Sequence, residues 1–97
     1  MFLDDINFSS LFSDKHGIEK YNIITSQILK EKSNIDNNYI EIIFKVAFFE
    51  YFGLEDNALQ NMLNDIGCKI TIDELKNTHK KSISMIKEYI KSVSDEE

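Results

Sequence analysis

Two side chains in this sequence could together do nucleophilic chemistry: the thiol of Cys68 and the imidazole of His79. One thiol and one imidazole are the minimum for an activated cysteine nucleophile. Cys68, however, stands between Gly67 and Lys69 at the entry to a helix, where simple packing is the usual role of a cysteine. His79 falls on the apolar stripe of that helix, where a hydrogen-bonded core or interface histidine is the common case. We therefore predict no catalytic residues and a protein that is not an enzyme.

Metal and cofactor chemistry also lacks the residues that it needs. His16 and His79 are far apart in the chain, and no His/Cys pair has the spacing of metal ligands. Residues 34–38 resemble the start of a calcium-binding loop, but Tyr39 replaces its glycine and Lys45 replaces its final glutamate. The sequence has no glycine-rich phosphate loop and no Asp-Ser pair of the kind that carries phosphopantetheine. It predicts neither a metal site nor a bound cofactor.

The charged residues argue against nucleic acid as a partner. All eleven basic residues are lysines, and with seventeen acids they give a net charge of −6. Arginine normally supplies the paired donors that recognise phosphate, so an acidic chain without arginine is poorly suited to hold nucleic acid. Residues 1–66 carry eleven acids and five lysines, whereas residues 67–97 carry six of each. The acidic part could bind a basic partner or imitate nucleic acid, which leaves an acidic inhibitor of a nucleic-acid enzyme as an alternative function.

Cysteine usage and hydropathy indicate where the protein acts. A single cysteine excludes an intrachain disulfide and favours a reducing compartment. Asp4 and Asp5 stand where a secretory signal would carry positive charge. The longest apolar-rich stretch, 39–54, is interrupted by charged residues and is too short to span a bilayer. We expect a cytoplasmic protein with no membrane partner.

Hydrophobic spacing predicts the first two long helices. Over 18–32, five residues fall within an arc of roughly 140° at 100° per residue and should form one buried face. They are Ile18, Tyr21, Ile24, Ile28 and Leu29. The polar run 33–38 is typical of a loop. The next helix, 39–54, has twelve apolar or aromatic residues out of sixteen, with Glu41 and Lys45 marking one solvated stripe.

Glycines and a capping motif predict the remaining helix ends. Gly53 and Gly67 are suited to the C-terminal stops that bound a short helix over 54–66. Thr71 and Glu74 form a capping box, which starts a last helix that runs to residue 93. The predicted fold is an all-α single domain over 1–97, a bundle of four main helices. Apolar residues between 2 and 12 allow a short fifth helix or an arm at the N-terminus, and we expect 94–97 to be a frayed tail.

The last helix carries a second line of residues beside its core stripe, small at first and then larger. This line consists of Thr78, Ser82, Met85 and Tyr89. Methionine and aromatic residues are enriched at interfaces. The central helix is also apolar on nearly every face and needs cover on several sides. We therefore predict a homodimer with this line at its interface, and a non-enzymatic protein that binds an unidentified protein partner, as regulators, immunity proteins and inhibitors do.

A helix-turn-helix outline supports one alternative function. The predicted helices 54–66 and 71–93 are joined by a four-residue turn, as in that DNA-binding motif. The first residues of the second helix would face DNA, and two of them are the acids Asp73 and Glu74. Five lysines follow on the same helix: Lys76, Lys80, Lys81, Lys87 and Lys91. A solvated face explains these lysines better than DNA binding does, so the nucleic-acid function stays the alternative.

Overall fold

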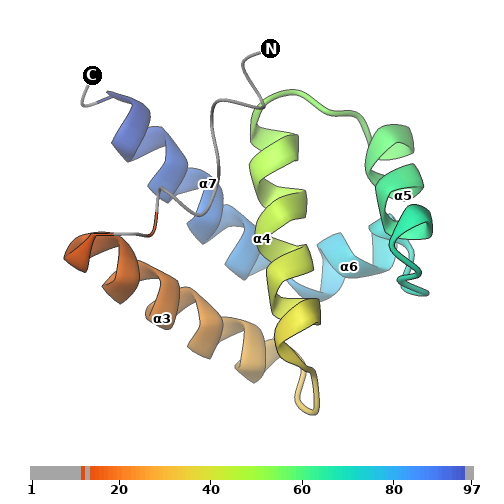
Figure 1. The fold of residues 1–97 in the computed structure, drawn as a ribbon, viewed down its shortest axis with the longest axis horizontal. Helices are drawn as coiled ribbons and strands as arrows, with labels where there is room; N and C mark the ends of the chain where they lie inside the picture. The colour runs from red at the N-terminus through yellow and green to blue at the C-terminus, as the bar shows by residue number, and fades with distance from the viewer. Residues whose placement is uncertain (1–11, 13, 96–97) are drawn as a thin grey trace.

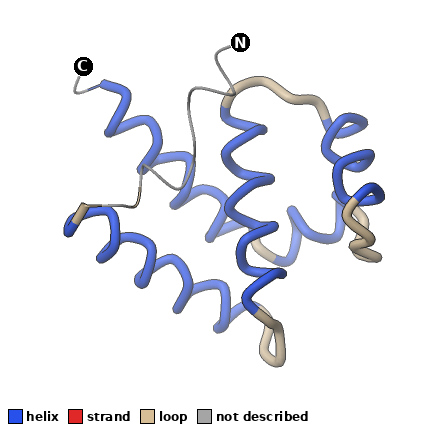
Figure 2. The backbone as a smooth tube through the Cα atoms, in the orientation of Figure 1, coloured by secondary structure: helices blue, strands red, loops and turns tan. Residues whose placement is uncertain are grey.

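The computed structural model describes residue 12 and residues 14–95, with side chains as far as Val93. Every element in this part of the chain is a helix or a loop (Figure 2), so the predicted all-α fold is confirmed. The elements are α3 (Lys15–Glu31), α4 (Asn37–Tyr51), α5 (Asp56–Asp65), α6 (Ile72–Thr78) and α7 (Lys80–Asp95). The predicted N-terminal helix or arm over residues 2–12 lies almost wholly outside the described residues.

Three helices begin at capping side chains. The Asp14 carboxylate accepts a hydrogen bond from the Gly17 N–H at 2.7 Å, and the Asp36 carboxylate accepts one from the Tyr39 N–H at 2.9 Å. These bonds satisfy N–H groups that the first turn of a helix leaves without a backbone partner. The Thr71 hydroxyl caps α6 in the same way, as the sequence predicts.

Glycines end α4 and α5. Gly53 has a φ of 100° and Gly67 a φ of 78°, the left-handed backbone conformation that glycine adopts without a steric penalty. The Leu54 N–H then reaches the Phe49 carbonyl at 3.0 Å, and the Cys68 N–H reaches the Leu63 carbonyl at 2.9 Å. These are the closing bonds of the Schellman motif, so both predicted stops are confirmed.

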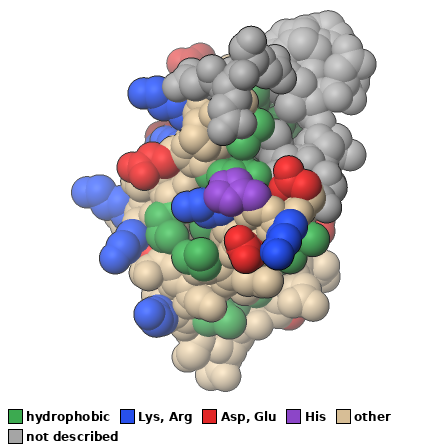
Figure 3. All heavy atoms as spheres, turned by 90° about the vertical axis from the view of Figure 1, so that its left-hand side faces the viewer, with side chains coloured by type: hydrophobic (Ala, Val, Ile, Leu, Met, Phe, Trp, Pro, Cys, Tyr) green, Lys and Arg blue, Asp and Glu red, His purple; other side chains and the backbone are tan. Residues whose placement is uncertain are grey.

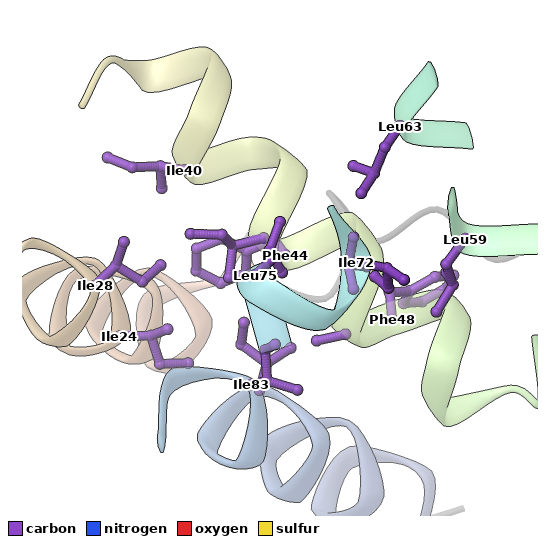
Figure 4. Close-up of a cluster of buried hydrophobic side chains, with 14 of the residues drawn as sticks. Ile24, Ile28, Ile40, Phe44, Phe48, Leu59, Leu63, Ile72, Leu75 and Ile83 are labelled. Carbon is purple, nitrogen blue, oxygen red and sulfur yellow. The ribbon is translucent and has the colours of Figure 1, made fainter. Parts of the chain in front are cut away.

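Helix α4 is the centre of the fold, with α3 and α7 on one side and α5 and α6 on the other (Figure 1). Its inner side chains meet those of all four neighbours in one apolar core (Figure 4). The core includes Ile24, Ile28, Ile40, Phe44, Phe48, Leu59, Leu63, Leu75, Ile83 and Ile86. The Glu41 and Lys45 side chains form an ion pair at 3.6 Å on the solvated stripe that the sequence predicts. No helix among the described residues is both long and apolar enough to cross a bilayer.

Two sequence predictions are wrong in detail. The last predicted helix is divided at His79, which ends α6 and precedes α7, so the described chain has five helices. The predicted buried face of the first helix is also too wide, because Ile18 and Leu29 remain 49% and 45% exposed. The face of α3 that packs on the core consists instead of Gly17, Tyr21, Ile24 and Ile28. The predicted frayed tail falls partly outside the described residues, and α7 continues to Asp95.

Candidate functional site

The division between α6 and α7 is built around the buried side chain of His79. Its imidazole is completely buried, and its two nitrogens contact side chains from two other helices. Nδ1 lies 2.8 Å from Glu31 Oε1 at the end of α3, and Nε2 lies 3.0 Å from Tyr39 Oη in α4. The predicted hydrogen-bonded core histidine is therefore confirmed, although its partners come from 48 and 40 residues earlier in the chain.

The Glu31 carboxylate is the acceptor at the centre of this network. It accepts hydrogen bonds from the Ser82 hydroxyl at 2.7 Å and from the Ser82 N–H at 3.2 Å. Gln27, one turn earlier on α3, donates a third bond at 3.3 Å. Burial alone raises the pKa of Glu31, but the hydrogen bonds from Ser82, His79 and Gln27 outweigh burial and lower this pKa overall. Glu31 is therefore a carboxylate at neutral pH.

The charge on Glu31 fixes the tautomer of His79. Because a carboxylate can only accept, Nδ1 carries the proton that faces Glu31, and in the neutral imidazole Nε2 is then left to accept from the Tyr39 hydroxyl. Burial raises the pKa of Tyr39, and the nearby Cys68, Glu74 and Glu31 raise it further. The phenol is therefore protonated and able to donate.

Carboxylate, imidazole and hydroxyl follow one another here in the order of a nucleophilic triad. The hydroxyl, however, is a phenol whose pKa is raised, which disfavours the phenolate. The imidazole is fully buried. Two surface hollows, one between α3 and α7 and one beside α4, are not lined by Glu31, His79 or Tyr39. Both ring nitrogens of His79 face other partners, so the geometry does not form the Cys68–His79 pair that the sequence raises. What this network does is join α3, α4 and α7.

The predicted interface line is partly inside the protein. Ser82 is completely buried against Glu31, and Tyr89 is 5% exposed, with its ring stacked on Phe12 at 5.1 Å between centroids. Thr78 and Met85 are half-buried. The line is therefore not one exposed edge, because its second and fourth members serve the chain's own core. Whether the remainder binds a second copy stays a prediction.

Two members of that line meet in a surface hollow between α3 and α7. This hollow, the α3–α7 groove, has a volume of about 350 Å³. It is lined by Lys20, Ile24, Met85, Glu88, Tyr89 and Ser92. The buried residues Ile24 and Tyr89 form its apolar floor, and the exposed residues Lys20 of α3 and Glu88 of α7 give its two rims charges of opposite sign. Figure 3, which views the molecule from the left of Figure 1, shows apolar side chains in small groups among charges of both signs.

A second hollow of about 210 Å³ lies beside α4 and is lined by residues that include Ile42 and Ile66.

Large aliphatic side chains are exposed mainly on α3. Ile18, Ile23 and Leu29 are 49%, 52% and 45% exposed, and within the described chain the remaining large exposed aliphatic residue is Ile66, at 53%. Helix α3 thus has apolar side chains on flanks that the core does not use. Hydrophobic spacing places Ile18 and Leu29 on the buried face and so does not reveal this exposure.

Two lysines of the C-terminal helices form ion pairs with acidic residues of the same chain. Lys76 and Lys87 contact the two oxygens of the Glu50 carboxylate at 2.6 and 2.7 Å, and Lys76 also contacts Asp56 at 2.9 Å. Burial raises the pKa of Glu50, but hydrogen bonds and charge from these two lysines lower it overall. Two of the five lysines proposed for DNA contact are therefore engaged in joining α4 to α6 and α7.

Comparison with known proteins gives no relative for this fold or site: no family model, no curated protein and no solved structure matches the chain. Within the described residues, no group of three or more His, Cys, Asp or Glu side chains is placed to hold a metal ion.

Proposed function

We propose that this chain acts without catalysis, as a homodimer that binds another protein, in the manner of a small regulator, immunity protein or inhibitor. The observation that carries the proposal is the exposure of three large aliphatic side chains on α3, namely Ile18, Ile23 and Leu29. Single exposed aliphatic residues are ordinary on protein surfaces, but Ile18 and Leu29 share one flank of α3 and Ile23 lies on another, so this helix has apolar surface on two sides for other proteins to cover. The single cysteine suits action in a reducing compartment such as the cytoplasm.

The α3–α7 groove is the proposed docking surface for the partner protein. Ile24, Met85 and Tyr89 give it an apolar floor, and Lys20 and Glu88 give it rims of opposite charge. Ile23 precedes Ile24 and lies near the Lys20 edge of α3, so it extends the apolar surface outward. An amphipathic segment that inserts one apolar side chain and carries charges of both signs beside it fits this arrangement.

A matched pair of variants tests this docking surface. Ile23 and Ile66 are exposed to almost the same extent, but Ile23 directly precedes the groove residue Ile24, whereas Ile66 lines the second hollow. We expect Ile23→Lys to lose a protein that the wild type and Ile66→Lys both retain in affinity capture from a native lysate, with circular dichroism unchanged. Equal retention by all three chains would contradict the proposal, because the groove would then contribute nothing to binding.

A further inference from the structure

Four residues of α3 form a stripe on the flank of the helix away from the α3–α7 groove. This α3 outer stripe consists of Ile18, Asn22, Thr25 and Leu29. At 100° per residue the four positions fall within an arc of roughly 60°. Ile18, Asn22 and Leu29 are exposed, and Thr25 is half-buried. Their spacing of four, three and four residues is the spacing that brings one helix against another in a coiled coil.

The stripe is symmetric about its own midpoint. Ile18 and Leu29 are equally far from that midpoint, and so are Asn22 and Thr25. If a second α3 lies antiparallel across a two-fold axis, Ile18 meets Leu29 of the second copy, and Asn22 meets Thr25 of the second copy. Each apolar side chain then faces an apolar one, and each polar side chain faces a polar one. A two-fold interface needs this self-complementarity.

The polar contact would satisfy an atom that the single chain leaves without a partner. Thr25 Oγ1 is shielded from solvent and has no hydrogen-bond partner within the described part of the chain. A buried hydroxyl without a partner is costly, and Asn22 of the second copy carries an amide that can donate to it. The chain's own atoms shield this hydroxyl, so it reaches the second helix only after χ1 rotates to the other rotamer that a helix allows threonine.

The charges beside the stripe are also complementary. Glu19, Ser26 and Lys30 are exposed along one edge of it. In the antiparallel arrangement Glu19 of one copy lies axially between Ser26 and Lys30 of the other, about 3 Å along the axis from each. This places an acid beside a base twice in every dimer.

From this symmetry, the unsatisfied hydroxyl and the charge match, we infer that two copies of the chain associate through antiparallel pairing of their α3 outer stripes. This inference rests on the proposed homodimer and names its interface. The seventeen residues of α3 span about 25 Å, and a contact along one such helix buries less than the roughly 1,200 Å² of a stable interface. The dimer therefore dissociates on dilution.

A charge exchange in the full-length chain tests the antiparallel register. Ile18→Lys and Leu29→Glu should each weaken self-association by about tenfold or more in sedimentation equilibrium, since each places a charge against an apolar side chain. The double variant should recover most of the wild-type association, because each Lys faces a Glu of the other copy. Parallel pairing would place Lys against Lys and Glu against Glu, so the double variant would stay monomeric. Ile66→Lys is the matched control and should associate like the wild type.

The possible outcomes of this experiment overturn different parts of the inference. A double variant that stays monomeric overturns the antiparallel register, and single variants that dimerise like the wild type overturn the stripe while leaving the homodimer standing. Single variants that lose their circular dichroism signal also overturn the stripe, since the chain's own fold would then need these side chains. A wild type that is monomeric at high concentration overturns both this inference and the homodimer. The Ile23 and Ile66 comparison then tests protein binding independently.

Discussion

The carboxylate of Glu31, in the last turn of α3, accepts hydrogen bonds from both the hydroxyl and the backbone N–H of Ser82, in the first turn of α7. The first N–H groups of a helix have no partner within the helix and are usually capped by a residue just before it. In α7 the residue before the helix is His79, whose side chain is turned inward to Glu31 and Tyr39. A carboxylate from 51 residues earlier therefore supplies the cap. A negative charge is favourable at that end of a helix.

Removing the charge of Glu31 should destabilise the whole fold. We expect Glu31→Gln to lower the free energy of unfolding by about 1–3 kcal/mol, because it weakens charge-assisted hydrogen bonds to Ser82 and His79 in a mostly buried site. Urea denaturation followed by circular dichroism measures this change. Asp65→Asn, at an exposed position at the end of α5, is the control and should change stability little. Equal effects of the two substitutions would mean that the Ser82 contact is not a cap.

Stability should fall in acid, with Glu31 and Glu50 responsible. Hydrogen bonds from Ser82 and His79 hold the pKa of Glu31 below its ordinary value of 4.5, and Lys76 and Lys87 do the same for Glu50. A carboxyl group whose pKa is lower in the folded state stabilises the protein above its unfolded pKa, and this stabilisation is lost as the pH falls through the folded pKa. The stabilisation from these two carboxylates should therefore be constant near neutral pH and decline below about pH 4.5. Denaturation of Glu31→Gln over the same range should show a shallower decline, and an identical slope would exclude Glu31 as a source.

The Tyr39 hydroxyl should contribute through His79. Tyr39→Phe removes the hydroxyl that is hydrogen-bonded to Nε2 of the fully buried imidazole. We expect this loss to cost about 1–2 kcal/mol of stability. Because Tyr39 and Glu31 act on the same ring, their effects should not be additive. A double-mutant cycle of Tyr39→Phe with Glu31→Gln measures the coupling. Strict additivity would indicate that the two contacts are independent.

Local signals predicted most of the helix ends, because each end depends on residues close to it in the chain. Gly53, Gly67 and Thr71 act within a few residues of their own positions, so their roles follow from sequence alone. The break at His79 was not predictable in this way. No glycine or proline marks it, and the apolar stripe continues through it at helical spacing. The break depends on Glu31 and Tyr39, which approach only when the chain has folded.

The extent of burial was the weaker part of the sequence prediction. Hydrophobic spacing shows that Ile18 and Leu29 lie near the buried arc of α3, but it does not show how wide an arc the neighbouring helices cover. For the same reason the spacing places Tyr89 on an interface line, whereas the structure places this residue in the interior. Periodicity orders the faces of a helix, whereas the positions of α4 and α7 decide which of them meet water.

The Thr71 cap should have a measurable and local effect. Its hydroxyl accepts a hydrogen bond from the Glu74 N–H at 3.1 Å, and we expect Thr71→Ala to cost about 1 kcal/mol because that donor loses its partner. Thr71→Ser keeps the hydroxyl and should retain nearly the wild-type stability. Chemical denaturation of the three proteins makes the comparison. A Thr71→Ala protein as stable as the wild type would show that α6 does not depend on this cap.

Charges introduced at Met85 and Tyr89 should have opposite structural consequences, although both residues line the α3–α7 groove. Tyr89 is buried and stacked on Phe12, so Tyr89→Glu places an unpaired charge in the interior and should cost several kcal/mol, on the order of 3 or more. Met85 is half-buried at the groove, where a lysine can extend its amine into solvent, so Met85→Lys should stay folded. Circular dichroism with thermal melting separates the two outcomes. If Tyr89→Glu melts at the wild-type temperature, the ring does not lie in the core, and Tyr89 joins Met85 as a residue that an interface could use.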